Sequence, residues 1–129
     1  MGTTERAAHN GLPTTITDNV EDGQFEVSAE GAIIGRQPYR RYGGHIVLLS
    51  TEVDPQWRGR GVSSALIDGV LGLIAAAEST VVPRCKLTGD YILHHPQYRS
   101  LVAEQYQSLL RPISRPDTEA DPQSATTES

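Results

Sequence analysis

The chain has 129 residues, of which 37% are hydrophobic and 21% are charged, and its formal net charge is −5. These values are typical of one globular domain and exclude a disordered chain or a bundle of membrane-spanning helices. The negative charge disfavours a nucleic-acid surface, and the single cysteine, Cys85, excludes an internal disulfide. Because the N-terminus lacks a basic-then-apolar export signal, we expect a cytoplasmic protein with no membrane partner.

Both ends of the chain are predicted to be mobile tails. Residues 1–14 are small and polar, and residues 111–129 are rich in proline, serine, threonine and acids with little to bury. The C-terminal tail has no amphipathic period or charge block, which favours an inert terminus over a partner-binding segment. We therefore expect one folded domain over residues 15–110.

The first half of this domain has the composition of strands. Residues 24–29 alternate around apolar positions, residues 32–42 are extended in character, and residues 45–53 are apolar and β-branched. A short opening strand over residues 15–19 precedes them. Gly43-Gly44 is a hairpin signal, so the pattern predicts an antiparallel meander.

A long helix and a crossover strand follow this meander. Apolar residues at three- and four-residue steps predict a helix that ends near Ser79: Val62, Leu66, Val70, Leu73, Ile74 and Ala77. Residues 81–83 then read as a short strand parallel to residues 45–53. Helical stretches over residues 88–94 and 97–110 complete a predicted α+β fold.

The turn that precedes the long helix has the parts of a phosphate-binding site. Gly59 and Gly61 allow close backbone approach, and the free N–H groups and dipole of a helix N-terminus attract anions. The charged and hydroxyl side chains of the turn add donors: Arg58, Arg60, Ser63 and Ser64. The alternative to a phosphate-binding turn is an ordinary loop in which the glycines serve only the chain reversal. The turn lacks the βαβ context of a Rossmann fingerprint and the Gly-Lys-Ser/Thr of a P-loop.

These residues resemble a known family. Val53-Asp54-Pro55-Gln56-Trp57-Arg58-Gly59-Arg60-Gly61-Val62-Ser63-Ser64-Ala65-Leu66 resembles motif A of the GNAT acetyltransferases, whose signature is R/Q-x-x-G-x-G/A. Arg58, Gly61 and Ser63 occupy the signature positions, with Ser63 in place of the usual Gly or Ala. A frame from Gln56 to Gly61 also satisfies the signature.

The resemblance covers most of residues 24–102 and is closest to the very short, single-domain branch of the GNAT superfamily. Similar proteins commonly have a histidine where Ser50 stands here and an aromatic residue where Leu87 stands. The resemblance implies a GNAT-like fold and acetyl-CoA as the ligand. The implied cofactor-binding residues are Val53, Arg58, Gly59, Arg60, Gly61, Val62, Ser63 and Ser64.

In such proteins the strand before the turn splays from its neighbour and pairs with the pantetheine arm, which the resemblance assigns to Val53. An amine then attacks the thioester carbonyl, so a base and an acid should flank the splay. Glu52 is the candidate base, unless it is a solvated surface acid. Tyr91, ahead of Tyr98, is the candidate acid for the thiolate, unless it is an amphipathic core residue.

Cys85 follows the crossover strand, where the resemblance places a cysteine close to the acetyl group. It accepts the acyl group in one interpretation and is a small buried hydrophobe in the other. The flanking Arg84 and Lys86 favour a reactive thiolate if they point toward the sulfur. The adjacent His94 and His95 project in different directions on a helix, so no metal site is expected.

Three functions remain open at this point. The first is an acetyl-CoA-dependent N-acetyltransferase with a protein or small-molecule amine as acceptor. The second is a non-catalytic acyl-CoA-binding module, and the third is an interaction domain with a structural glycine turn. The short domain leaves little material for a deep acceptor pocket, which favours a peptide or an exposed lysine. Five acids between residues 18 and 30 would attract a cationic acceptor if they border the groove.

Overall fold

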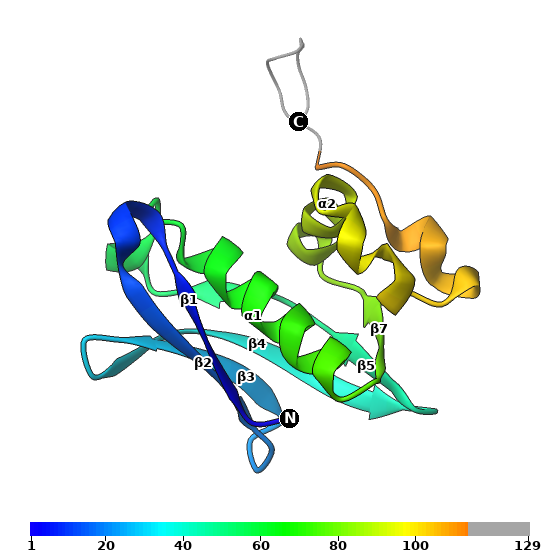
Figure 1. The fold of residues 1–129 in the computed structure, drawn as a ribbon, viewed down its shortest axis with the longest axis horizontal. Helices are drawn as coiled ribbons and strands as arrows, with labels where there is room; N and C mark the ends of the chain where they lie inside the picture. Colours follow the sequence, from blue (N-terminus) through cyan, green and yellow to red (C-terminus); the bar gives the residue numbers. More distant parts are fainter. Residues whose placement is uncertain (114–129) are drawn as a thin grey trace, which may run out of the picture.

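The computed structural model describes residues 1–113, which form an α+β fold around one curled, seven-stranded sheet (Figure 1). The strand order is β1-β2-β3-β4-β5-β7, and β6 pairs with β4. Only the β5–β7 pairing is parallel among these named strands, so the predicted fold class is confirmed. The strands are β1 (Thr3–Ala7), β2 (Pro13–Asn19), β3 (Gln24–Ala29), β4 (Ala32–Tyr42), β5 (His45–Leu48), β6 (Glu52–Val53) and β7 (Thr80–Pro83).

Helix α1 (Val62–Ala76) lies across one face of the sheet and closes the hydrophobic core (Figure 1). The predicted apolar face is buried at Val62, Leu66, Val70, Leu73 and Ile74. The helix ends three residues before the predicted Ser79, because the chain turns through a left-handed Glu78 with φ of 56°. Ala77 is therefore exposed instead of buried.

The C-terminal part of the described chain lies beside β7. Helix α2 (Lys86–His94) begins two residues earlier than predicted. The predicted helix over residues 97–110 is instead two 3₁₀ helices, η3 (Pro96–Leu101) and η4 (Glu104–Leu109). They are separated because Val102 is extended and bridges to Val81. From residue 114 on, the predicted C-terminal tail lies outside the described residues. No helix within residues 1–113 is long and apolar enough to cross a membrane.

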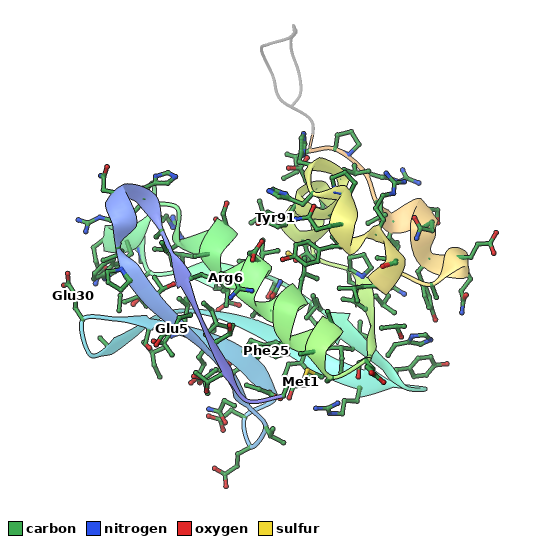
Figure 2. The ribbon with its side chains drawn as sticks, viewed as in Figure 1. Met1, Glu5, Arg6, Phe25, Glu30 and Tyr91 are labelled. Atoms are coloured by element: carbon green, nitrogen blue, oxygen red, sulfur yellow. The ribbon has the colours of Figure 1, made fainter. Side chains whose placement is uncertain are left out.

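The prediction of a mobile tail over residues 1–14 is wrong. Strand β1 pairs with β2 along five residue pairs, and the 3₁₀ turn η1 (His9–Gly11) joins the two strands. The sheet curls so that β1 lies beside α1, and Arg6 Nε donates to Asp68 Oδ1 at 2.6 Å (Figures 1 and 2). No residue of β1 is buried. The strand is held by backbone pairing and one ion pair, which hydrophobic periodicity does not reveal.

The predicted strand over residues 45–53 is interrupted. Tyr39 pairs with Leu48 and Arg36 pairs with Glu52, so two residues of β4 face three residues of the neighbouring strand. One of the two β4 residues is Pro38, which has no N–H to donate to the ladder. The result is a bulge over residues 49–51, and it separates β5 from β6.

Candidate functional site

The glycine turn presents unpaired backbone amides at the N-terminus of α1. Gly59 and Gly61 have φ values of +77° and +79°, a region that favours glycine, and Gly61 is the N-cap of the helix. The first helical bond runs from the Ala65 amide to the Gly61 carbonyl at 3.1 Å. The amides of residues 62–64 therefore have no partner within the helix, and they point out of its positive end.

These amides face a cavity of about 580 Å³ that continues along β6. Seven of the eight predicted cofactor-binding residues line it, and the candidate base Glu52 lines it as well. Of the predicted set only Arg60 is absent from the lining. The lining residues are His9, Thr51, Glu52, Val53, Trp57, Arg58, Gly59, Gly61, Val62, Ser63, Ser64 and Leu87.

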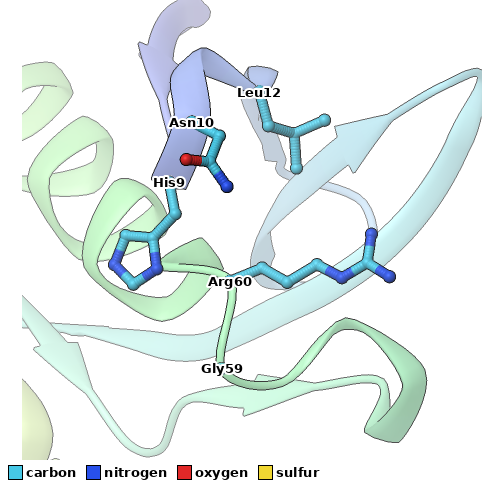
Figure 3. Close-up of a pocket in the computed structure, with 5 residues that line it drawn as sticks. All are labelled: His9, Asn10, Leu12, Gly59 and Arg60. Carbon is cyan, nitrogen blue, oxygen red and sulfur yellow. The ribbon is translucent and has the colours of Figure 1, made fainter.

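The two arginines of the turn lie differently. Arg58 Nε donates to the Val53 carbonyl at 3.3 Å, which ties the turn to β6. The Arg60 guanidinium lies 4.9 Å from the centre of the Trp57 ring and lines a second cavity of about 370 Å³. His9, Asn10, Leu12 and Gly59 line this second cavity with it (Figure 3). Both cavities thus share the turn, and each has one arginine.

The strands that lead to the turn diverge. Strand β5 runs parallel to β7 as far as the Leu48–Pro83 pair, and the Cys85 amide then donates to the Leu48 carbonyl at 3.0 Å. Beyond that point β6 pairs with β4 alone. A side chain at Gly35 of β4 would lie 2.8 Å from the Glu52 carbonyl, so β4 and β6 approach closely. The opposite edge of β6 faces the cavity.

A glycine turn with these free amides, a strand edge that opens beside it and a crossover helix recur in one group of enzymes. The sequence model of the GCN5-related N-acetyl-transferase family matches residues 24–101, more than half of the chain. The chain belongs to this family. No curated protein matches it. Membership confirms the resemblance and supports an acetyltransferase-type function in general terms.

The matched region of this GNAT chain begins at β3 and ends with η3. It contains the turn, both diverging strands and α1. Strands β1 and β2 and the turn η1 precede it, so the N-terminal hairpin lies outside the matched residues.

The candidate base Glu52 is exposed on β6 at the wall of the larger cavity. Its nearest polar partner is Ser50, whose hydroxyl donates to Glu52 Oε2 over a long 3.4 Å. No salt bridge holds this carboxylate among the described residues. It is therefore available to accept a proton from a ligand in the cavity.

Cys85 lies at the base of the divergence and is 6% exposed. Its Sγ lies 3.1 Å from Thr51 Oγ1, and Thr51 lines the larger cavity. Arg84 and Lys86 do not accompany the sulfur: both are exposed and line a separate cavity beside η4. The condition for a thiolate stabilised by these two cations is therefore not met. The polar neighbour of the thiol is a hydroxyl.

Gln37 holds the Thr51 hydroxyl beside Cys85. The sequence did not predict a role for Gln37. The residue is fully buried on β4, and its Nε2 donates to Thr51 Oγ1 at 3.1 Å and to Thr88 Oγ1 at 2.7 Å. Since Thr51 accepts from Gln37, its own proton is free to point at Cys85 Sγ. Gln37 Oε1 is buried without a partner among the described residues. A glutamine at an inward position of a β-strand is the signal that would have identified it.

The candidate acid Tyr91 lies away from the larger cavity, on α2 (Figure 2). Its hydroxyl donates to Asp68 Oδ2 at 2.6 Å, and its ring stacks on His95 at 3.8 Å between centres. Burial and then the Asp68 carboxylate raise the pKa of Tyr91, so it is a weaker acid than a free tyrosine. Partial burial raises the pKa of Asp68, but hydrogen bonds from Arg6, Tyr91 and Tyr98 outweigh it and lower the net pKa.

The histidines do not form a metal centre within residues 1–113, where no three His, Cys, Asp or Glu side chains gather to hold an ion. His94 and His95 instead contact backbone carbonyls of α2. His9, which the sequence analysis placed in the tail, lies against the glycine turn and lines both cavities.

Proposed function

We propose that the protein is an N-acetyltransferase that transfers the acetyl group of acetyl-CoA to a primary amine. The observation that carries this proposal is the glycine turn, whose unpaired amides open into a cavity continuous with the free edge of β6. Family membership supports acetyl-CoA as the donor. A cytoplasmic location, where acetyl-CoA is available, belongs to the same proposal.

In this proposal the pyrophosphate binds the amides of residues 62–64, with hydroxyl donors from Ser63 and Ser64 and a cation from Arg58. The pantetheine arm adds to the edge of β6 at Val53, as an extended chain adds to a sheet, and Arg58 leaves the Val53 carbonyl to reach the phosphate. The acetyl group then lies between β6 and β7, close to Thr51. The residues named for the phosphate and pantetheine contacts all line the cavity, and so does Thr51, whereas no residue of β7 does.

The chemistry assigned to this site needs a neutral amine. Glu52 accepts a proton from the ammonium form of the acceptor, directly or through a water molecule. The nitrogen attacks the thioester carbonyl, a C–N bond forms and the C–S bond breaks as the tetrahedral intermediate collapses. The nitrogen loses a second proton as the intermediate collapses and the departing thiolate takes up one proton, while Glu52 returns its proton to solvent, so the acetyl group and all protons are accounted for.

Cys85 does not line the larger cavity, but its Sγ contacts Thr51, which does, and so it offers a second route. Its thiolate would take the acetyl group first, release coenzyme A as a thiol and pass the acetyl group to the amine. The Thr51 hydroxyl lies 3.1 Å from Cys85 Sγ, where it can donate a hydrogen bond to the sulfur. An acetylated Cys85 in the mass of the protein would distinguish this route from direct transfer.

The larger cavity is open, which favours a peptide or an exposed lysine as the acceptor. None of the five acids between residues 18 and 30 lines it, so electrostatic capture of the acceptor by the N-terminal strands has no support at this wall. Glu52 is the acidic residue of the lining. We propose that it both attracts and deprotonates the amine.

A non-catalytic acyl-CoA-binding module is the second candidate. Leu87 lines the cavity at the position where similar proteins have an aromatic residue, and the Tyr91 hydroxyl is held by Asp68. Binding of acetyl-CoA without thiol release, over a panel of primary amines, would favour this candidate. Thiol release that depends on an amine would exclude it.

The proposal is tested by calorimetric titration with acetyl-CoA of the wild-type protein and of Ser63→Glu. An acid in the first turn suits the helix dipole, so the variant should fold while its carboxylate repels the pyrophosphate. We expect affinity to fall on the order of a hundredfold, because a like charge placed against a ligand costs several kcal/mol. Ser100→Glu, at an exposed site on η3, adds the same charge elsewhere and should bind normally. Failure of the wild-type protein to bind would refute the proposal.

A further inference from the structure

The N-terminal hairpin lies outside the region matched by the family, yet one of its residues, His9, lines the larger cavity. Resting on the proposed function, we propose that His9 is a pyrophosphate-binding residue of this site. The imidazole supplies a side-chain N–H donor to a phosphate oxygen, next to the backbone donors of the glycine turn. The ligand class is the phosphoanhydride of a nucleotide coenzyme.

The turn η1 is docked on the glycine turn by backbone and side chain. The His9 amide donates to the Arg60 carbonyl at 2.8 Å, although the two residues are 51 positions apart in sequence. The imidazole covers the α-carbon of Gly61: a methyl group built there would lie 2.8 Å from His9 Nε2 and closer still to Cδ2. His9 is therefore fixed at the helix N-terminus where the phosphate is expected.

The hairpin that carries His9 is anchored on both sides. The pairing of β1 with β2 is continuous from Thr3 to Ala7, and the Ala8 amide donates to the Leu12 carbonyl at 2.8 Å across η1. On the other side Arg6 pairs with Asp68, and its Nη2 lies where a side chain at Gly72 would be. This anchoring reduces the entropy that His9 would lose on binding a ligand.

The imidazole is free to bind. The His9 side chain is exposed, and neither ring nitrogen has a hydrogen-bond partner within residues 1–113. It lines both cavities, and Figure 3 shows it beside the turn that carries Gly59 and Arg60. An imidazole N–H beside a phosphate makes a charge-assisted hydrogen bond, the stronger class of such bonds.

Three ligands distinguish the contributions of the phosphate groups to binding. They are coenzyme A, dephospho-coenzyme A, which lacks the 3′-phosphate, and pantetheine, which has no phosphate. We expect His9→Ala to weaken both phosphate-bearing ligands about tenfold, the value of one hydrogen bond to a charged group. Its affinity for pantetheine should not change. The matched control His94→Ala removes an exposed histidine from the end of α2 and should bind all three as the wild type does.

Two further variants distinguish a packing role of the His9 ring from a role in phosphate binding. His9→Phe keeps a planar ring against Gly61 without a donor, and His9→Gln keeps an N–H donor without the ring. Thermal unfolding checks that each variant is folded. If His9 binds phosphate, His9→Phe loses the affinity that His9→Ala loses, and His9→Gln retains part of it.

Several outcomes would overturn the inference and leave the proposed function intact. They are wild-type affinity for coenzyme A in His9→Ala, retained affinity in His9→Phe, and an equal loss of pantetheine binding. A loss for coenzyme A but not for dephospho-coenzyme A would also overturn it, since His9 would then contact the 3′-phosphate. If the wild-type protein binds none of the ligands, the proposed function fails as well.

Discussion

The glycine turn and the cluster around Asp68 are built in opposite ways. The turn takes its donors from consecutive backbone amides at one helix end. The cluster takes its groups from three elements: Arg6 is 62 positions before Asp68, and Tyr91 is 23 positions after it. The first needs a local sequence, whereas the second exists only when β1, α1 and α2 have come together.

The difference predicts whether a mutation acts first on ligand binding or first on the stability of the fold. A substitution in the turn changes backbone geometry and so acts on ligand binding directly. A substitution in the cluster removes contacts between elements and so acts first on stability. His9 crosses this division, because a residue from the N-terminal hairpin packs on the local turn.

The largest effect is expected at Gly61. Gly61→Ala places a side chain at positive φ and against the His9 ring, and the two penalties together should cost about 3 kcal/mol of unfolding free energy. Acetyl-CoA binding should be lost with them. Urea unfolding measures the stability and calorimetry measures the affinity.

Gly59→Ala is the matched control for this variant. Its φ of +77° gives the same backbone strain, but nothing lies within 4 Å of the added methyl group. We expect a loss of about 1–2 kcal/mol. Adding His9→Ala should restore part of the stability of Gly61→Ala and none of that of Gly59→Ala. Equal stability of the two glycine variants would show that the ring does not pack on Gly61.

The next effect is expected at Asp68, which accepts from both Arg6 and Tyr91. Asp68→Asn should destabilise the fold by about 2 kcal/mol, because two hydrogen bonds to a partly buried carboxylate lose their charged acceptor. Asp22→Asn, in the exposed turn between β2 and β3, is the control and should be nearly neutral. Unchanged stability of Asp68→Asn would mean that the cluster does not hold the elements together.

The same variant has a defined pH dependence. The net pKa of Asp68 is lowered in the folded protein from an ordinary value of 3.8, so protons bind the unfolded chain more strongly. The stability from its ionised form is complete above 3.8 and is lost as the pH falls through the lower, folded value. The difference between wild type and Asp68→Asn should therefore narrow below pH 3.8. A constant difference down to pH 2 would contradict the lowered pKa.

How far the sequence predicts the molecule follows the same division. Strands β3 and β4 lie at the predicted residues because alternation and glycine punctuation are local signals. The turn was predicted for the same reason. The break between β5 and β6 was not predicted. It depends on Pro38 lying opposite residues 49–51 in the sheet, and this pairing cannot be read from either segment alone.

The missed features are long-range. His9 and Gln37 have no local signal of function: one lies in a polar N-terminal stretch and the other in a β-strand. The contact of Gln37 with Thr51 appears only once β4 has paired with β5 and β6, and that of His9 with Gly61 only once the sheet has curled. The catalytic assignments of Glu52, Cys85 and Tyr91 stay predictions, since a residue type near a strand end does not establish a reaction.

The smallest expected effect is at Tyr91, where the two kinds of region can be compared in one residue. Tyr91→Phe keeps the ring stacked on His95 but removes the hydroxyl that donates a hydrogen bond to Asp68. We therefore expect a stability loss of about 1 kcal/mol. Acetyl-CoA affinity should not change, because the residue lies outside the cavity lining. Tyr106→Phe, whose ring meets the edge of the His45 ring, is the control.

Turnover decides the role of this hydroxyl. Its raised pKa makes it a poor proton donor to a departing thiolate, so amine-dependent thiol release should be largely retained in Tyr91→Phe. A fall of about a hundredfold or more, the usual range for loss of a general acid, with affinity unchanged would instead assign Tyr91 to the reaction. In that case the Asp68 cluster would have to open during catalysis, and the Arg6 anchor of the N-terminal hairpin would move with it.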